Sequence, residues 1–265
     1  MKKKYTIIFS DLDGTILDKN SFKFDKIKNY IRKLISKRVI LVPNSSKTEI
    51  EIKNFIEELG IDLPFICENG SAIHNLDLIN KKLPKKLILS KDIKSISKLY
   101  LEKVPLKIRK KIIDLRKINK ADQIKIFGLP KNKIKHALKR SFTIPIKFTD
   151  EIKDKKKFIK IINNSGLKIQ EGGRIMNLGD NVDKSLAMQI FLKKVKIFIK
   201  DPIKTIGIGD SHNDIGMLKN TDIPCLVYNE GFNRKNIKIK KLIVSDKPSP
   251  QGWADVIKKA VLKIK

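Results

Sequence analysis

A short apolar strand that ends in two closely spaced carboxylates constrains the fold of this chain most. The apolar run at residues 5–9 is brief and bounded by polar residues, which is typical of a strand buried in a sheet. Asp11 and Asp13 follow it, and a Gly-Thr pair comes next. In an open α/β sheet, ligands bind just beyond the carboxyl ends of the strands. The alternative is a simple turn, since Asp-Gly is a common turn dipeptide.

The spacing of Asp11 and Asp13 predicts a cation. Side chains two residues apart on an extended chain point the same way, so these two carboxylates would repel each other without a positive charge between them. Mg²⁺ is typically held by one or two carboxylates together with phosphate oxygens of the substrate. A second acidic strand end supports this expectation, because the apolar run 204–208 leads into Gly-Asp-Ser-His-Asn-Asp. An N-cap role at a helix start could explain either Asp210 or Asp214. It does not explain two aspartates together with an Asn in the same segment.

A third strand end has groups that suit an anion. The apolar run 39–42 is followed by Ser45, Ser46 and Lys47, and Thr48 with Glu51 forms a capping box that opens a helix. Hydroxyls, backbone N–H groups and a Lys at a strand-to-helix turn favour phosphate binding. The alternative is that the serines only cap the helix.

Four segments in order resemble the motifs of the haloacid dehalogenase superfamily, most of whose members are phosphatases. The motifs are the Asp-Leu-Asp-Gly-Thr segment 11–15, Ser45, Lys184 at a helix start, and the Gly-Asp-x-x-Asn-Asp segment 209–214. Within that superfamily, segments 44–48 and 64–73 are very similar to the mannosyl-3-phosphoglycerate phosphatases, a subclass with an α/β cap domain. The resemblance spans nearly the whole chain.

The resemblance implies a role for each motif. Asp11 would be the nucleophile that becomes phosphorylated, and Asp13 the general acid and base. The implied site residues are as follows: catalytic, Asp11, Asp13, Ser45 and Lys184; Mg²⁺ ligands, Asp11, Asp13 through its backbone carbonyl, Asp210 and Asp214; substrate-binding, Ser46, Lys47, Asn69, Gly173, Arg174 and Asn213. Arg174 would hold the glycerate carboxylate. The segment after it lacks the aromatic residue that is usual in the family, so the identity of the substrate's sugar is not determined.

Strands that alternate with helices predict an α/β fold, a three-layer Rossmann-like core with a parallel sheet and an inserted α/β cap domain. We expect the core at 1–79 and 179–265 and the cap at 80–178. Within the cap we predict strands at 123–127 and 144–148, helices at 133–140 and 158–162, and a last strand that opens at 167–169.

The composition of the chain limits which partners it is expected to bind and in which cellular compartment it is expected to occur. The chain has 59 Lys and Arg against 28 Asp and Glu, a formal charge of +31, which attracts polyanions. These residues are spread along the whole chain without an RNA-binding motif, so we expect no nucleic-acid partner. Cys67 and Cys225 lie in apolar runs and are expected to be buried thiols, and His74 to be structural or at the surface. The apolar run after the first lysines is too short for a signal peptide, and no run could span a membrane, which favours a cytoplasmic protein.

The sequence leaves alternatives open for both the substrate and the class of function. The resemblance implies hydrolysis of mannosyl-3-phosphoglycerate to mannosylglycerate, a compatible solute. Glucosyl-3-phosphoglycerate, which differs at one sugar hydroxyl, or another sugar phosphate is also possible. The competing class is a polyanion-binding protein on an inactive form of the same fold, which the charge of +31 motivates.

Overall fold

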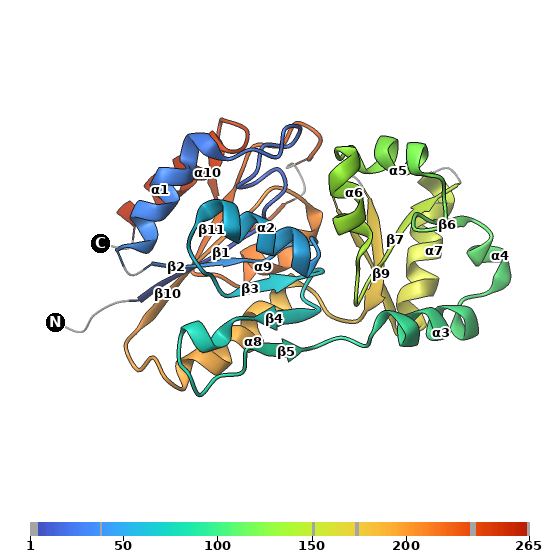
Figure 1. Cartoon of the computed structure of the whole chain (residues 1–265), viewed down its shortest axis with the longest axis horizontal. Coiled ribbons are helices and arrows are strands. Elements are labelled where there is room, and N and C mark those ends of the chain that lie inside the picture. The colour runs from blue at the N-terminus through green and yellow to red at the C-terminus, as the bar shows by residue number, and fades with distance from the viewer. Residues whose placement is uncertain (1–4, 38, 150–151, 173–174, 234–236, 264–265) are drawn as a thin grey trace.

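The structure is a computed structural model that describes residues 5–37, 39–149, 152–172, 175–233 and 237–263. Two parts lie side by side along the long axis (Figure 1). One holds a central sheet with both chain ends. The other is a smaller α/β unit formed by the middle of the chain. This confirms the predicted α/β fold with an inserted unit.

The central sheet is entirely parallel, in the order β12-β11-β10-β1-β2. Its strands are β1 (Tyr5–Ser10), β2 (Val39–Pro43), β10 (Ile203–Gly209), β11 (Ile223–Leu226) and β12 (Ile243–Val244). Ser10 is in register with Ile208 on one side and with Pro43 on the other. The segments after β1, β2 and β10 therefore leave the sheet next to one another.

Helices cover both faces of this sheet, so the strands are apolar on both sides, as parallel strands usually are. Ile8 packs towards α1 (Asp25–Ile35), α2 (Glu49–Leu59) and α10 (Gln251–Leu262). Its neighbours Ile7 and Phe9 point to α8 (Lys184–Lys196) and α9 (Ile215–Lys219). Phe9 meets Phe191 edge-on with ring centroids 5.3 Å apart. The three-layer core is thus present as predicted.

A small antiparallel sheet extends the core beyond β2. It consists of β3 (Phe65–Cys67), β4 (Ala72–His74) and β5 (Lys86–Ile88), and Asn44 bridges to Ile66 at its edge; a short 3-10 turn, Leu76–Leu78, follows β4. His74 is buried and stacks on Phe65 with ring centroids 4.6 Å apart, so its role is structural. Cys67 and Cys225 are buried free thiols, as expected.

The cap unit is a four-stranded antiparallel sheet in the order β6-β7-β9-β8 with helices on it. Its elements are α3 (Ile93–Lys103), α4 (Leu106–Arg109), β6 (Ile112–Asp114), α5 (Lys120–Phe127), α6 (Lys131–Leu138), β7 (Ile144–Phe148), α7 (Ile152–Asn164), β8 (Leu167–Glu171) and β9 (Met176–Asp180). β5 pairs with β4 although it lies beyond residue 79. The division at residues 79/80 and 178/179 stays a prediction.

Two predictions for the cap are wrong. Residues 123–127 form the end of helix α5, not a strand. Ile124 and Ile126 alternate as in a strand, but Asn119 caps the helix by accepting a hydrogen bond from the Asp122 N–H, and Gly128 ends it in the left-handed conformation. The strand that opens at residue 167 is also not the last of the cap, because β9 follows it as the second arm of a hairpin.

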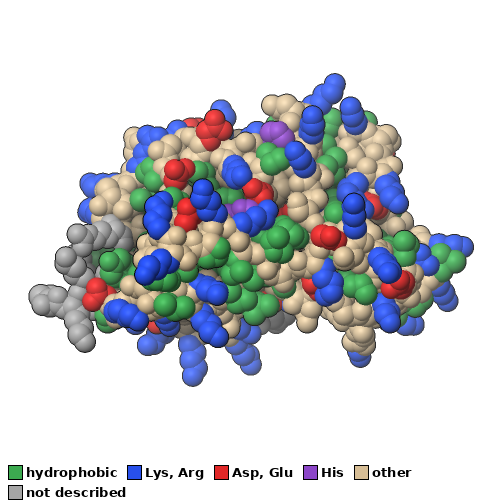
Figure 2. All heavy atoms as spheres, turned by 60° about the horizontal axis from the view of Figure 1, so that its bottom comes forward, with side chains coloured by type: hydrophobic (Ala, Val, Ile, Leu, Met, Phe, Trp, Pro, Cys, Tyr) green, Lys and Arg blue, Asp and Glu red, His purple; other side chains and the backbone are tan. Residues whose placement is uncertain are grey.

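The surface charge is widely spread. Figure 2 shows Lys and Arg side chains over the whole of one face, on core and cap alike, rather than in one patch. Within the ranges that the structure describes, no helix combines the length and the apolar character that crossing a membrane requires.

Candidate active site

The turn after β1 places Asp11 beside the next strand of the sheet. The Asp11 N–H donates to the Ile208 carbonyl at 2.9 Å, which extends the pairing of β1 with β10 by one residue. Gly14 then turns the chain with φ +74°, and a Cβ at this position would lie 2.6 Å from Asp210 Oδ2. Only a glycine both adopts this conformation easily and lets the backbone approach Asp210 so closely.

Three buried carboxylates from the two acidic strand ends meet at this edge. Asp11, Asp210 and Asp214 each offer an oxygen within 4.8 Å of the others. Thr15 Oγ1 donates to Asp210 Oδ1 at 3.1 Å, and Asn229 Nδ2 donates to Asp210 Oδ2 at 2.7 Å. Asp214 Oδ2 accepts the N–H groups of Asp210 and Ser211, each at 3.1 Å. Two aspartates of the fourth motif thus have different environments.

The carboxylates carry more negative charge than their surroundings offset. Burial raises the pKa of Asp210 well above its usual range, and the neighbouring Asp214 and Asp11 raise it further. Burial also raises the pKa of Asp214, against the lowering effect of Lys184. A divalent cation would remove this mutual repulsion, and carboxylate oxygens are the ligands that Mg²⁺ prefers. The residues present therefore fit Mg²⁺.

Lys184 is the cation that the fold itself supplies. Asp183 caps helix α8 by accepting from the Leu186 N–H, and Asn44 Nδ2 donates to the Lys184 carbonyl at 2.9 Å. Lys184 is 1% exposed, and its Nζ lies 2.8 Å from Asp11 Oδ1 and 2.7 Å from Asp214 Oδ1. Burial by itself would lower the pKa of Lys184, but the two carboxylates raise it. The ammonium group is therefore held charged.

Asp13 is not part of this group of three carboxylates and pairs with Lys47 instead. Lys47 Nζ lies 2.9 Å from Asp13 Oδ2 and 3.2 Å from Glu51 Oε1. Desolvation raises the pKa of Asp13, and the charge of Lys47 opposes this increase. Glu51 also closes the predicted capping box, because it accepts from the Thr48 N–H at 3.0 Å. The expected substrate-binding residue Lys47 thus faces the expected general acid.

The other predicted residues lie around the same edge. Ser45 and Asn69 are buried, and the Asn69 N–H donates to the Ser45 carbonyl at 2.9 Å. Asn213 Nδ2 donates to Asn69 Oδ1 at 3.1 Å, which ties the fourth motif to the loop after β3. Ser46 and Asn213 line the pocket described next. Gly173 and Arg174 lie outside the described residues.

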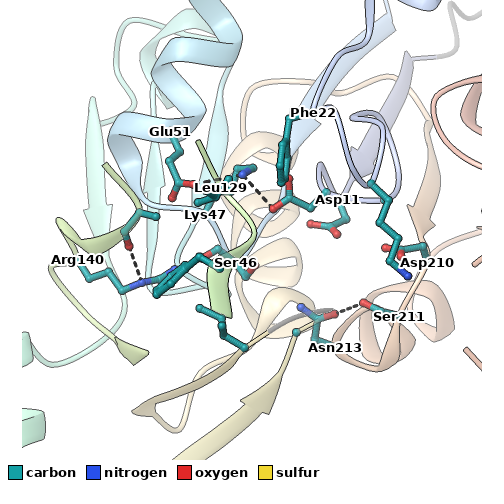
Figure 3. Close-up of a pocket in the computed structure, with 17 residues that line it drawn as sticks. Asp11, Phe22, Ser46, Lys47, Glu51, Leu129, Arg140, Asp210, Ser211 and Asn213 are labelled. Carbon is teal, nitrogen blue, oxygen red and sulfur yellow. Dashed lines mark hydrogen bonds and ion pairs between the residues drawn. The ribbon is translucent and has the colours of Figure 1, made fainter. Parts of the chain in front are cut away.

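A pocket opens between this edge and the cap (Figure 3). Its core side holds Asp11, Asp13, Gly14, Lys19, Phe22, Ser46, Lys47, Glu51, Asp210, Ser211 and Asn213, and its cap side holds Phe127, Leu129, Ala137, Arg140, Gly172 and Ile175. Arg140 and Asp210 stand at opposite sides of the view. Among the described residues, the pocket therefore has an acidic end in the core and a cap wall that is mostly apolar and includes the Arg140 guanidinium.

Several residues in or next to the site were not among the predicted site residues. Thr15 was part of the first motif and could have been read as a hydrogen-bond donor to a neighbouring carboxylate. Asn229 lies three residues past β11, so its place beyond a strand end was the available signal. Phe22 packs into an apolar cluster with Leu129 and Ala137 of the cap, and only the tertiary structure reveals this contact.

Comparisons with known proteins agree with this geometry. The family model of haloacid dehalogenase-like hydrolases matches residues 8–257. A glucosyl-3-phosphoglycerate/mannosyl-3-phosphoglycerate phosphatase of Persephonella marina is 32% identical over 260 residues, 95% of each chain. A protein of Methanococcoides burtonii with the same name is 29% identical over 269 residues, also 95% of each chain.

Solved structures show the same fold. A crystal structure of a Thermoplasma acidophilum protein superposes with a TM-score of 0.69 at 19% identity and covers 97% of this chain and 98% of that one. One from Thermotoga maritima has a TM-score of 0.64 at 16% identity, covering 96% and 97%. The resemblance to the sugar-phosphoglycerate phosphatases is confirmed, and this chain belongs to the haloacid dehalogenase-like hydrolases as a phosphoric monoester hydrolase.

Proposed function

We propose that the protein hydrolyses mannosyl-3-phosphoglycerate and glucosyl-3-phosphoglycerate to the glycosylglycerate and phosphate. The observation that carries the proposal is the meeting of Asp11, Asp210 and Asp214 with Lys184, in a group whose Asp11 and Asp210 line a pocket next to the cap. The names of the two relatives supply the substrate class. The product would be a compatible solute made in the cytoplasm.

In the first step, the Asp11 carboxylate attacks phosphorus in line, and the bond from phosphorus to the glycerate oxygen breaks. Asp13 donates its proton to the departing alkoxide, a role that a raised pKa favours because the carboxyl group keeps its proton more readily. Lys47 holds the Asp13 carboxyl beside the pocket at 2.9 Å. The result is a phosphoryl group on Asp11 and a free glycosylglycerate.

In the second step, water attacks the aspartyl phosphate while Asp13 takes a proton from it, which releases phosphate and restores both carboxyl groups. Ser45 and Lys184 hold the phosphoryl oxygens through both steps. The substrate phosphate must approach a carboxylate, and opposite charges about 4 Å apart at an effective dielectric near 20 contribute roughly 4 kcal/mol. Lys184 supplies one such charge.

Asp11, Asp210 and the Asp13 backbone carbonyl would hold Mg²⁺, with Asp214 next to the ligands. When bound, the ion would neutralise charge on the phosphoryl oxygens. Asp214 is an outer residue in this scheme because its oxygens already accept from Lys184 and from two backbone N–H groups.

The cap wall supports acceptance of both sugars. Phe127, Leu129 and Ala137 line it with apolar side chains. These three side chains can cover the faces of a sugar ring, but they offer no hydrogen bond to a hydroxyl, and discrimination by apolar contact alone is weak. Mannose and glucose differ at one hydroxyl, so we expect similar kcat/KM values for the two substrates.

Phosphate release measured with Mg²⁺ across a panel of sugar phosphates tests this function. We expect the two glycosyl-3-phosphoglycerates to be the best substrates and Asp11→Asn to abolish their turnover. Preference for an unrelated sugar phosphate would overturn the substrate assignment. Tight, salt-sensitive binding of nucleic acid with no phosphatase activity would instead support the polyanion-binding alternative.

A further inference from the structure

Arg140 is a pocket residue whose hydrogen bonds all go to neutral groups. It follows helix α6, and its Nε donates to the Ala137 carbonyl at 3.1 Å. Its Nη1 donates to the Ser46 carbonyl at 3.2 Å and to Thr143 Oγ1 at 2.8 Å. Its Nη2 has no hydrogen-bond acceptor among the described residues. The guanidinium therefore keeps a free edge at the pocket.

The charge of Arg140 lacks a close counter-ion. No carboxylate of the residues that the structure describes lies within ion-pair distance of it. Glu51 is near enough for Arg140 to help lower its pKa, but Lys47 already pairs with Glu51 at 3.2 Å. By contrast, Arg116 on the cap is paired with Asp114 at 2.7 Å. A positive group held at a pocket without an acid to neutralise it is suited to bind an anionic part of a ligand.

A buried network holds Arg140 in this place. Thr143 Oγ1, which accepts from Arg140, donates to Glu68 Oε2 at 2.7 Å. Glu68 also accepts the N–H groups of Ser141 at 2.8 Å and Phe142 at 3.1 Å. Glu68 and Thr143 are each 2% exposed. The guanidinium is thus fixed by a core residue through the cap, which reduces the entropy lost when it binds a ligand.

The hydrogen bond from Arg140 to the Ser46 carbonyl indicates which anionic group of the substrate the guanidinium would bind. Ser46 follows Ser45, the residue proposed to hold the phosphoryl group, so the guanidinium lies on the cap side of the phosphate position. Lys184 lies 2.8 Å from Asp11, the proposed nucleophile, and is the residue proposed to hold the phosphate there. In a glycosyl-3-phosphoglycerate, the carboxylate lies on the same three-carbon unit as the phosphate and would reach the cap side.

We propose that Arg140 is a specificity-determining residue that binds the glycerate carboxylate of the substrate. The proposal rests on the proposed function, and it adds a residue to Arg174, for which the family resemblance implies this role. The planar fork of Arg matches a carboxylate better than the point charge of Lys does. The substrate class would then be phosphate monoesters in which the carbon next to the phosphate-bearing carbon carries a carboxylate.

A pair of substrates that differ only in this charge tests the proposal. Glucosyl-3-phosphoglycerate and its primary carboxamide are assayed with Mg²⁺ on the full-length enzyme. We expect Arg140→Gln to lower kcat/KM for the acid about 10- to 100-fold, mainly through KM, and to change the value for the amide by less than about threefold. Arg116→Gln, a cap arginine that is paired with Asp114, is the matched control and should change neither.

Arg140→Lys keeps the charge without the fork, so the preference for the acid should fall to a value between those of wild type and Arg140→Gln. This second variant also answers the question if Arg140→Gln does not fold. An equal loss on acid and amide, or an unchanged preference in either variant, would overturn the role of Arg140. Failure of the wild-type enzyme to hydrolyse any glycosyl-3-phosphoglycerate would refute the proposed function instead.

Discussion

Lys184 Nζ lies 2.8 Å from Asp11 Oδ1, in a place where both side chains are almost fully buried. The same ammonium group lies 2.7 Å from Asp214 Oδ1. The fold therefore places its own cation among three carboxylates before any ion binds. The ammonium group of Lys184 offsets part of the repulsion between the three carboxylates. The same residue therefore contributes both to the stability of the core and to the proposed catalytic site.

Replacing Lys184 by Met should destabilise the protein strongly, because it leaves Asp11 and Asp214 buried without their partner. We expect a loss of about 3–5 kcal/mol in the free energy of unfolding at neutral pH without Mg²⁺. Urea denaturation measures it. Lys168→Met is the control, since Lys168 pairs with Asp183 at 2.7 Å but is partly exposed, and it should cost less than about 1 kcal/mol. Equal losses in both variants would contradict this explanation.

Mg²⁺ should stabilise the wild-type protein through Asp210. An ion at a hundredfold excess over its Kd adds about 2.7 kcal/mol to the free energy of unfolding, a shift of several degrees in Tm. Asp210→Asn should remove most of this shift and most of the turnover. Asp222→Asn is the control, because Asp222 accepts from Thr205 away from the pocket and should keep the shift. A full Mg²⁺ shift in Asp210→Asn would place the ion elsewhere.

Gly14→Ala should damage the site beyond its effect on the backbone. Ala in the left-handed conformation costs roughly 1–2 kcal/mol, and here its Cβ would also lie 2.6 Å from Asp210 Oδ2. Gly166→Ala is matched to it, since Gly166 has φ +84° with nothing within 4 Å of the added atom. We expect similar losses of stability from conformation alone, but a loss of Mg²⁺ affinity only in Gly14→Ala. Titration of each variant with Mg²⁺ distinguishes them.

His74 should make stability depend on pH. Burial lowers the pKa of His74 from 6.5 to about 4, although Glu49, 3.5 Å away, acts in the opposite direction. The unfolded chain therefore takes up a proton that the folded chain refuses between these values. Stability is full above pH 6.5 and falls as the pH decreases towards 4, by about 1–3 kcal/mol in all.

Urea denaturation at pH 7.5, 6 and 5 measures this slope, and His74→Gln should make it less steep than in wild type. The raised pKa values of Asp210 and Asp214 act in the opposite direction, but they are common to both proteins. Glu49 does not interfere in this range, because its own pKa is lowered to about 2 and its contribution is lost only below the unfolded value of 4.5. A slope in His74→Gln as steep as in wild type would assign the effect to other groups.

Much of the core follows from local signals in the sequence. The capping box of Thr48 and Glu51, the left-handed Gly60 that ends α2, and the N-cap Asp183 are formed by residues within one helical turn of each other. The buried strands are short apolar runs between polar segments. Because parallel strands end at one edge of a sheet, the carboxylates after β1 and β10 could be predicted to meet before any coordinates were known.

The tertiary structure decided what depends on contacts between distant segments. An alternating apolar pattern did not distinguish a strand from helix α5, whose buried side depends on packing in the cap. The partner of Lys47 is Asp13, and the free edge of Arg140 depends on Glu68 and Thr143, which lie on different parts of the fold. A sequence specifies such pairs only through the folded chain, because a side chain's charge and hydrogen-bond partners are set by what packs against it.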